Sequence, residues 1–153
     1  MTIILDANLL LLLVVGMASR TYIATHQRLT AYTTDDFLLL RTFLSKAKWI
    51  VVTPNTLTEA SNLVAYIADP ARTRIYEVFR TLVKTPGIEE QYVESVIAVD
   101  RIEFLRLGLT DAALLHNTTA SRVLLTADLD LYLAATKKGL QAENFNHLRF
   151  RSL

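Results

Sequence analysis

The sequence predicts an α/β fold, a three-layer α/β/α sandwich in which helices cover both faces of a central, mostly parallel sheet. Short apolar runs that suit buried strands lie at residues 2–5, 49–53 and 122–126, and segments with apolar residues at helical spacing lie between them. Strands that alternate with helices favour a parallel sheet. The chain has 153 residues, 52% of them hydrophobic, and we expect a single domain over residues 1–153.

The first third of the chain predicts a strand followed by two helices. The strand at 2–5 is apolar enough to require cover on both faces. The apolar run 9–18 is shorter than the roughly 20 residues of a membrane span, so it indicates a buried helix, and we see no targeting segment. Caps and acidic charge at 34–36 favour the start of a second helix, whose apolar residues recur up to position 44.

The remainder predicts two further strands, a candidate last strand and several helices. After the strand at 49–53 we expect helices at 56–68, 75–83 and 88–104, with a turn at 85–87. Gly108 precedes another helix, and the strand at 122–126 leads into a helix at 129–138 that Gly139 ends. Residues 140–145 suit a last strand before a basic tail that contains Arg149 and Arg151.

Composition excludes several kinds of site. Lys and Arg number 16 against 15 Asp and Glu, so overall charge gives no reason to expect a nucleic-acid partner. The chain has no cysteine, which excludes disulfides, thiolate zinc sites and cysteine nucleophiles and fits a reducing cytoplasm, where we expect the protein. The three histidines lie too far apart for a local zinc motif. Any metal chemistry would therefore use oxygen ligands.

Four carboxylates occupy positions that a parallel sheet would bring together. Asp6 and Asp128 each follow a predicted strand directly, Glu59 lies on the first turn after another strand, and Asp111 opens the helix that leads into the third. Ligands of parallel sheets bind outside the carboxyl ends of the strands. We therefore expect the four acids to share one edge of the sheet.

Helix capping is the alternative explanation for these acids. Residues 56–59 match a capping box that ends in Glu59, Thr110 can cap the helix that Asp111 opens, and Asp128 can itself be a cap. Asp6 is least explained in this way, because Asn8 is available as the cap of the following helix.

If the four acids do converge, they repel one another. Two like charges about 4 Å apart cost roughly 4 kcal/mol at an effective dielectric constant of 20. Mg²⁺ or Mn²⁺ suits such a cluster, because these hard cations take carboxylates while keeping positions for water and phosphate oxygens. Two such ions could activate a water and stabilise the leaving oxygen at phosphorus.

In order and spacing, the acids and their neighbours resemble the PIN-domain ribonucleases, including the VapC-like toxins. The resemblance is carried by Asp6-Ala7-Asn8 after the first strand, Glu59, Leu109-Thr110-Asp111-Ala112-Ala113, and Leu124-Leu125-Thr126-Ala127-Asp128-Leu129-Asp130. It spans nearly the whole chain and implies a Rossmann-like sandwich, a Mg²⁺ or Mn²⁺ site and cleavage of single-stranded RNA. The longer stretch 20–33 and the polar residues 55–58 depart from the compact toxin members.

The resemblance also implies a role for each matched residue. Asp6, Glu59 and Asp111 would be the principal metal ligands and Asp128 the fourth acid of the catalytic set. The supporting polar residues would be Asn8, Thr126 and Asp130. The presence of all four acids favours an active enzyme over a member that has lost activity.

The leading hypothesis is thus a metal-dependent endoribonuclease. The toxin of a toxin and antitoxin pair is one form of it, and an RNA-processing or RNA-binding PIN-like module is its variant. A phosphoryl transferase with an aspartyl nucleophile is disfavoured, because Asn8 stands where its second acid is expected. A non-enzymatic interaction domain whose acids only cap helices remains open.

The expected partners are single-stranded or structured RNA, a second copy of the chain in a homodimer and, for a toxin, an antitoxin protein; no membrane is expected. Basic residues would contact the RNA backbone, but the sequence does not select among them. The candidates are Arg20, Arg28, Arg41, Lys46, Lys48, Arg72, Arg74, Lys137 and Lys138. Four aromatic residues are expected in the core, namely Tyr66, Tyr76, Phe79 and Tyr92.

Overall fold

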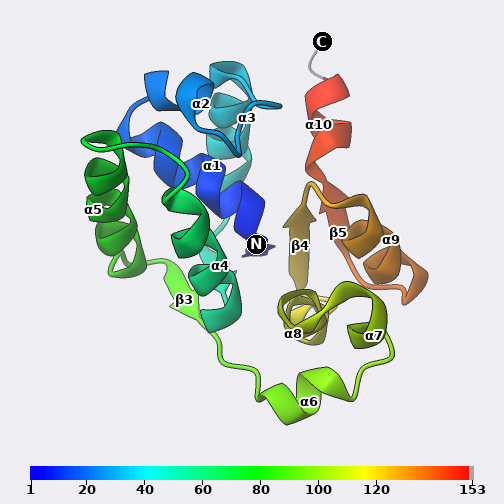
Figure 1. The fold of residues 1–153 in the computed structure, drawn as a ribbon. Coiled ribbons are helices and arrows are strands. Elements are labelled where there is room, and N and C mark those ends of the chain that lie inside the picture. Colours follow the sequence, from blue (N-terminus) through cyan, green and yellow to red (C-terminus); the bar gives the residue numbers. More distant parts are fainter. Residues whose placement is uncertain (152–153) are drawn as a thin grey trace.

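A five-stranded sheet runs through the molecule in the order β3-β2-β1-β4-β5, and every pair of neighbouring strands is parallel. Figure 1 labels β3, β4 and β5 of this sheet and the helices around it. The computed structural model describes residues 1–151. In chain order its elements are β1 (Thr2–Leu5), α1 (Ala7–Ala18), α2 (Thr21–Thr25), α3 (Thr34–Leu44), β2 (Trp49–Val52), α4 (Pro54–Val64), α5 (Ala71–Val83), β3 (Ile88–Glu90), α6 (Ser95–Val99), α7 (Phe104–Leu107), α8 (Leu109–Asn117), β4 (Arg122–Thr126), α9 (Leu129–Lys137), β5 (Ala142–Asn144) and α10 (Phe145–Arg151).

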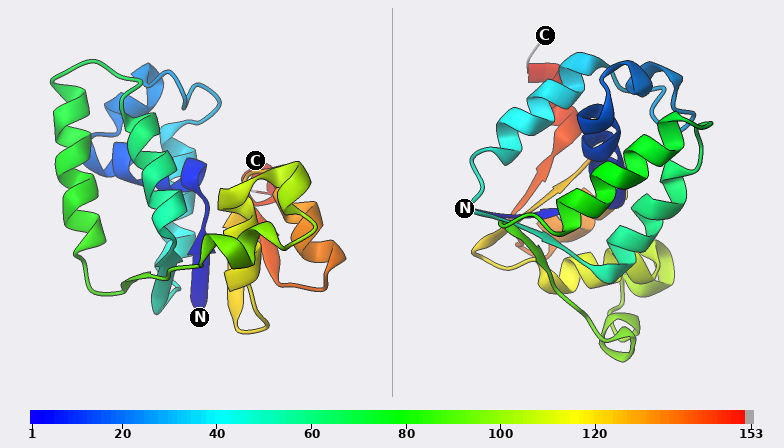
Figure 2. Two further views of the ribbon diagram at one scale, coloured as in Figure 1. Left: turned by 60° about the horizontal axis from the view of Figure 1, so that its bottom comes forward. Right: turned by 90° about the vertical axis from the view of Figure 1, so that its left-hand side faces the viewer.

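Helices cover the sheet on both faces, so the predicted α/β sandwich is confirmed (Figure 2). Successive side chains of a strand point to opposite faces. Accordingly, Ile3 and Leu5 of β1 pack in the larger core with α1, α3, α4 and α5. Ile4 packs on the other side with α8 and α9. The central strand is therefore buried on both faces, as its uninterrupted apolar run predicted.

The chain changes direction across the sheet between β1 and β4. From β1 it moves outward through β2 to β3, and it then returns to place β4 on the other side of β1 and β5 beyond it. A crevice forms outside the carboxyl ends of the strands at such a switch point, and ligands of open α/β sheets bind there. Asp6 follows β1 and Asp128 lies two residues after the end of β4, so both acids flank this point.

Two segments differ from the sequence prediction. The helix expected at 88–104 is wrong, because the segment begins with β3, which pairs with β2 from Ile50↔Ile88 to Val52↔Glu90. The short helices α6 and α7 follow it. The last strand is shorter than the expected 140–145, and the basic tail forms the helix α10.

Helix α4 and the aromatic residues show smaller differences. Helix α4 covers Pro54–Val64, and so begins and ends earlier than the expected 56–68. Tyr76 and Phe79 pack against the larger core, as expected. The core prediction is wrong for Tyr92, which is 74% exposed, and for Tyr66, which is 40% exposed and lies under the Arg28 guanidinium. Within residues 1–151, none of the helices combines the length and hydrophobicity needed to cross a bilayer.

Candidate active site

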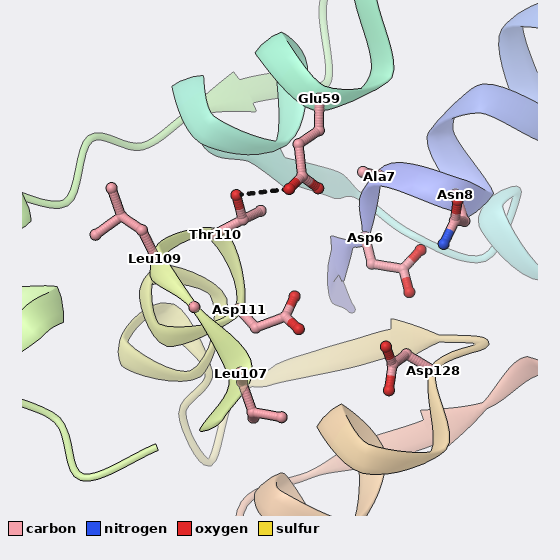
Figure 3. Close-up of a pocket in the computed structure, with 10 residues that line it drawn as sticks. Asp6, Ala7, Asn8, Glu59, Leu107, Leu109, Thr110, Asp111 and Asp128 are labelled. Carbon is pink, nitrogen blue, oxygen red and sulfur yellow. Dashed lines mark hydrogen bonds between the residues drawn. The ribbon is translucent and has the colours of Figure 1, made fainter. Parts of the chain in front are cut away.

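The four predicted acids line a single cavity of about 460 Å³. Four different segments of the chain supply them: the end of β1, the second turn of α4, the first turn of α8 and the turn after β4. The side chains of Asp6, Glu59, Asp111 and Asp128 all point into this space (Figure 3). The prediction that the sheet topology would bring the four together therefore agrees with the geometry.

Asp6 is the most deeply held of the four. Its side chain is only 4% exposed, and its Oδ1 accepts a hydrogen bond from the Leu9 backbone N–H at 3.0 Å. Its Oδ2 accepts from the Thr126 hydroxyl and from the Ala127 backbone N–H at 3.2 Å. Asp6 is therefore the N-cap of α1, and the expectation that Asn8 would be that cap is wrong. A carboxylate has about four lone-pair sites, so three of the sites on Asp6 are already used.

Burial makes the ionised form of Asp6 costly. Loss of hydration raises its pKa to about 6, although the hydrogen bonds from Thr126, Leu9 and Ala127 act in the opposite direction. The nearby charge of Asp128 contributes to this increase. A cation beside Asp6 would favour its ionised form and remove this cost.

Asp128 is also a helix cap, as the alternative explanation allowed. Its Oδ1 accepts from the Leu131 backbone N–H at 3.0 Å at the start of α9. Its own N–H donates to the Thr126 hydroxyl at 2.9 Å. Thr126 thus holds both Asp6 and the turn that carries Asp128, which fixes two acids of the cavity relative to each other.

Glu59 has no capping role, so the capping box expected at 56–59 is wrong. The N-cap of α4 is Thr53, whose hydroxyl accepts from the Thr56 backbone N–H at 3.0 Å. Glu59 instead accepts a hydrogen bond from the Thr110 hydroxyl of α8 at 3.1 Å (Figure 3). Thr110 in turn does not cap α8, whose N-cap is Gly108 without a side-chain hydrogen bond. The contact joins α4 to α8 across the cavity.

Asp111 bears the strongest unfavourable electrostatics. Burial and, to a smaller extent, the charges of Asp128, Asp6 and Glu59 together raise its pKa to about 7. No opposing cause acts on this pKa. Moreover, none of the described residues that line the cavity is Lys, Arg or His. The cavity therefore concentrates negative charge without a basic side chain to balance it.

The start of α8 depends on a glycine. Gly108 has φ 88° and ψ −179°, a backbone conformation that is open almost only to glycine. With Leu107 and Leu109, it forms one wall of the cavity next to Asp111. The sharp change of direction at Gly108 separates α7 from α8 and aims the first turn of α8 at the acids.

The three supporting residues lie in different places. Asn8 is exposed and lines the cavity. Thr126 is fully buried and bonded to Asp6, as described above. Asp130 lies outside the cavity lining, with its side chain 71% exposed and 4.0 Å from Arg106. Asp130 therefore belongs to the exposed surface of α9.

The donor set fits a hard divalent cation in its chemistry, because four carboxylates face one space without a competing cation. However, among residues 1–151 no three carboxylate or imidazole groups are already gathered closely enough to hold a metal ion together. Asp6 is fixed by its hydrogen bonds, whereas Glu59 has a single exposed contact. Glu59 and Asp111 are thus the side chains that would have to turn toward an ion.

Sequence reasoning missed the contacts that hold the site. The bond from Thr110 to Glu59 joins residues 51 positions apart, and the bond from Ala127 to Asp6 joins residues 121 apart. No local pattern signals either contact. The alternation of strand and helix placed the acids at one edge but could not show which polar groups bind them.

Comparisons with known proteins leave the function open. No family model matches the chain, and the comparison with curated proteins found no relative. Among solved structures, the chain is similar to a domain of a functionally unknown protein from Methanocaldococcus jannaschii DSM 2661. That match has 17% sequence identity and a TM-score of 0.47, and covers 94% of this chain and 89% of that chain. A likeness of this degree assigns no function, which must be argued from the site.

Proposed function

We propose that this protein is a metal-dependent phosphodiesterase, an endoribonuclease that cleaves RNA with Mg²⁺ or Mn²⁺ held by Asp6, Glu59, Asp111 and Asp128. One observation carries the proposal: four carboxylates from four separate segments face one cavity whose described lining has no basic residue. Such an arrangement is unfavourable without a cation, as the raised pKa of Asp111 indicates. The PIN-like order of the acids along the chain points to the same chemistry.

The four acids would have different roles in metal binding, depending on how firmly each side chain is held. Asp6 is held by three hydrogen bonds and lines the cavity, so it would fix the position of an ion. Glu59 and Asp111 would complete the coordination, with Glu59 leaving the Thr110 hydroxyl. A divalent ion here would activate a water and stabilise charge on a phosphate oxygen. Asn8, exposed at the rim, is placed to contact the substrate or a water.

Two alternatives are weaker. An aspartyl nucleophile at position 6 is disfavoured, because Asn8 stands where such an enzyme carries its second acid. An interaction domain whose acids only cap helices accounts for Asp6 and Asp128. Capping does not account for Glu59 or for Asp111, whose ionisation the fold makes costly.

The setting of this activity is proposed on other grounds. RNA is favoured as substrate by the PIN resemblance, and a toxin with an antitoxin partner is one subgroup of that family. A homodimer and a cytoplasmic location remain proposals, the latter because the chain has no cysteine.

A cleavage assay tests the proposal directly. Wild-type protein should cut a fluorescent single-stranded RNA when Mn²⁺ is present and lose the activity when the ion is chelated. Asp111→Asn and Glu59→Gln should each reduce the rate by at least a hundredfold, because each removes an expected ligand but no helix cap. Asp130→Asn, an exposed acid of the same region, should cut like the wild type. Metal-dependent cleavage that survives Asp111→Asn would overturn the assignment.

A further inference from the structure

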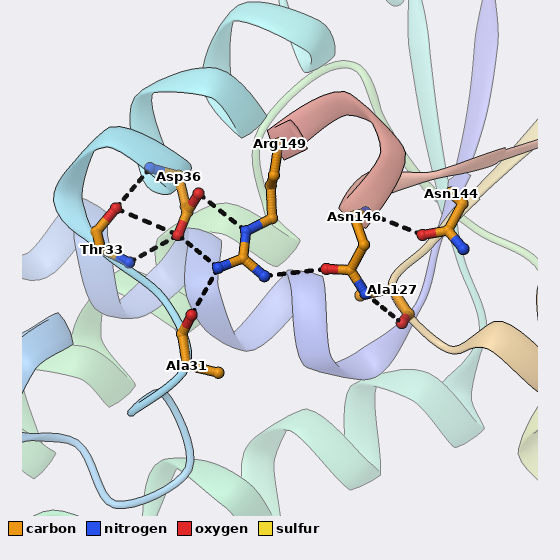
Figure 4. A network of polar contacts seen from close by, with 7 residues as sticks. All are labelled: Ala31, Thr33, Asp36, Ala127, Asn144, Asn146 and Arg149. Carbon is orange, nitrogen blue, oxygen red and sulfur yellow. Dashed lines mark hydrogen bonds and ion pairs between the residues drawn. The ribbon is translucent and has the colours of Figure 1, made fainter. Parts of the chain in front are cut away.

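A chain of polar contacts leads from helix α3, through the C-terminal helix α10, to the turn after β4 that holds Asp6 (Figure 4). None of the four residues that form it lines the cavity. The chain consists of Asp36, Arg149, Asn146 and Ala127, in that order. Each of these residues has hydrogen-bond partners on two sides, so a shift of one residue can displace the next.

Arg149 is the anchor of this chain. Its guanidinium binds both oxygens of Asp36, at 2.9 Å from Nε and 3.0 Å from Nη2, and donates to the Ala31 carbonyl at 2.6 Å. It also lies over the Tyr32 ring, 4.8 Å from its centre. Asp36 is itself fixed, because its Oδ2 accepts from the backbone N–H of Thr33 in the capping box of α3. A planar guanidinium with paired contacts has little freedom to move.

Asn146 carries the contact from Arg149 to the site. Its Oδ1 accepts from Arg149 Nη1 at 3.0 Å, and its Nδ2 donates to the Ala127 carbonyl at 3.2 Å. Its backbone N–H donates to the buried Asn144 side chain at 2.9 Å. Because one end of the amide accepts and the other donates, its orientation is determined by these two partners.

Ala127 connects the chain to the acids. Its carbonyl accepts from Asn146, while its own N–H donates to Asp6 Oδ2 at 3.2 Å. The residue stands between Thr126, which also binds Asp6, and Asp128. The orientation of this turn therefore sets the surroundings of two of the four carboxylates.

We propose that Asn146 and Arg149 are positioning residues of the acidic site, which hold the turn after β4 so that Asp6 and Asp128 face an ion in a fixed arrangement. The inference rests on the proposed function. Removing a contact that orients a metal ligand without touching the metal typically lowers metal affinity or activity 10–100-fold. The competing explanation is that the same contacts only attach α10 to the rest of the molecule.

Two conservative variants separate these explanations. Asn146→Asp keeps an oxygen for Arg149 but loses the N–H₂ group that binds the Ala127 carbonyl. The negative charge that it adds would by itself favour a cation, so weaker metal binding reports on geometry. Arg149→Lys keeps the charge but loses the paired contacts with Asp36. The matched control is Arg151→Lys on the same helix, whose contact with Glu143 is exposed and 3.9 Å long.

The experiment measures Mn²⁺ affinity by calorimetry on the full chain, together with amide hydrogen exchange of Ala127 without metal. We expect the dissociation constant for Mn²⁺ to rise about tenfold in both variants and to stay unchanged in Arg151→Lys. Exchange of the Ala127 N–H should be about tenfold faster in Asn146→Asp, while the far-ultraviolet circular dichroism stays as in the wild type.

The outcomes distinguish the two proposals. If the wild type binds Mn²⁺ and both variants bind it equally well, positioning is wrong and the proposed function stands. If the wild type binds no Mn²⁺, the proposed function fails, and the positioning of metal ligands fails with it. Unchanged exchange at Ala127 in Asn146→Asp would overturn the role of Asn146 even if metal binding weakened.

Discussion

Asp111 differs from the other acids of the cavity in having no visible structural task. Asp6 and Asp128 cap helices, and Glu59 accepts a hydrogen bond from Thr110. Burial and three neighbouring charges all oppose the ionised form of Asp111. A residue whose charge destabilises the folded protein is a strong functional candidate, because such unfavourable groups occur mainly at functional sites.

Replacing Asp111 by Asn should therefore stabilise the metal-free protein. At pH 8 we expect the free energy of unfolding to rise by on the order of 1 kcal/mol, a modest figure because the side chain is partly exposed. Urea denaturation in the presence of a chelator measures this change. Mn²⁺ should raise the melting temperature of the wild type but not of Asp111→Asn, and Asp130→Asn should behave as wild type in both respects. A less stable Asp111→Asn protein would indicate a structural role for the carboxylate.

At the same scale, the sequence identified the acids but misassigned the caps. Both Asp6 and Asn8 precede the apolar run of α1, and either is a favourable cap. Contacts with the end of β4 and the turn after it determine which residue is the cap. Thr126 and Ala127 hold Asp6 in the position from which it also accepts a hydrogen bond from the Leu9 N–H. A contact across 120 positions of sequence is not visible in a local pattern. The cap and the candidate metal ligand are consequently the same residue.

At the scale of elements, strands with a clear apolar run were predicted well, and the polar strand β3 was not. Strands β1 and β4 were predicted with their observed bounds because each contains a distinct apolar run, followed by an acid within two residues of the strand end. Strand β3 has three residues, two of them glutamates, and it exists because it pairs with the edge of β2. Pairing with a strand 38 positions away overrides the local preference for helix, so 88–104 was predicted incorrectly.

The packing of α1 against α3 gives a prediction for one glycine. Replacing a helical Gly by Ala usually stabilises a protein by about 0.5–1 kcal/mol. At Gly16 the added Cβ would lie within 2.6 Å of three ring atoms of Phe37, which is fully buried. Overpacking of this kind costs about 1–3 kcal/mol and should exceed the helical gain. We expect Gly16→Ala to be destabilised in urea.

A double-mutant cycle identifies the cause. Phe37→Leu alone should lose stability because it leaves space in the core. If the ring of Phe37 is what the new Cβ meets, the combined variant should be more stable than the sum of the two single changes implies. Additive losses would mean that the destabilisation of Gly16→Ala arises elsewhere in α1.

At the scale of the whole molecule, the sheet topology explains why four scattered acids meet. Asp6 and Asp128 follow the neighbouring strands β1 and β4, on the two sides of the switch point. Glu59 lies on α4, which follows β2, and Asp111 lies on α8, which precedes β4, and both helices meet the same edge of the sheet. This order of elements was readable from the alternation of strand and helix. The connections between α10 and this edge were not readable, because polar side chains on a short terminal helix have no pattern that names their partners.

The pH dependence of global stability follows from the two raised pKa values. In the folded protein the pKa is about 6 for Asp6 and about 7 for Asp111, against 3.8 for an unperturbed Asp. A carboxyl whose folded pKa is raised favours folding fully below pH 3.8, and this contribution is lost as the pH rises through the folded pKa. Without metal, both groups should therefore lower the free energy of unfolding between about pH 4 and pH 7, by about 3 kcal/mol for Asp6.

The difference between wild type and Asp111→Asn reports on the second group together with its electrostatic coupling to the other acids of the cavity. In urea denaturation with a chelator, the advantage of the Asn variant should grow from pH 4 to about pH 7 and then stay constant, since Asp111 is fully ionised above its folded pKa. Saturating Mn²⁺ should reverse the trend in the wild type, because an ion that binds the carboxylates stabilises the folded state most where they are ionised. Parallel stability curves for the two proteins would mean that the ionisation of Asp111 is not opposed by the fold, and the electrostatic argument for a cation in this cavity would then fail.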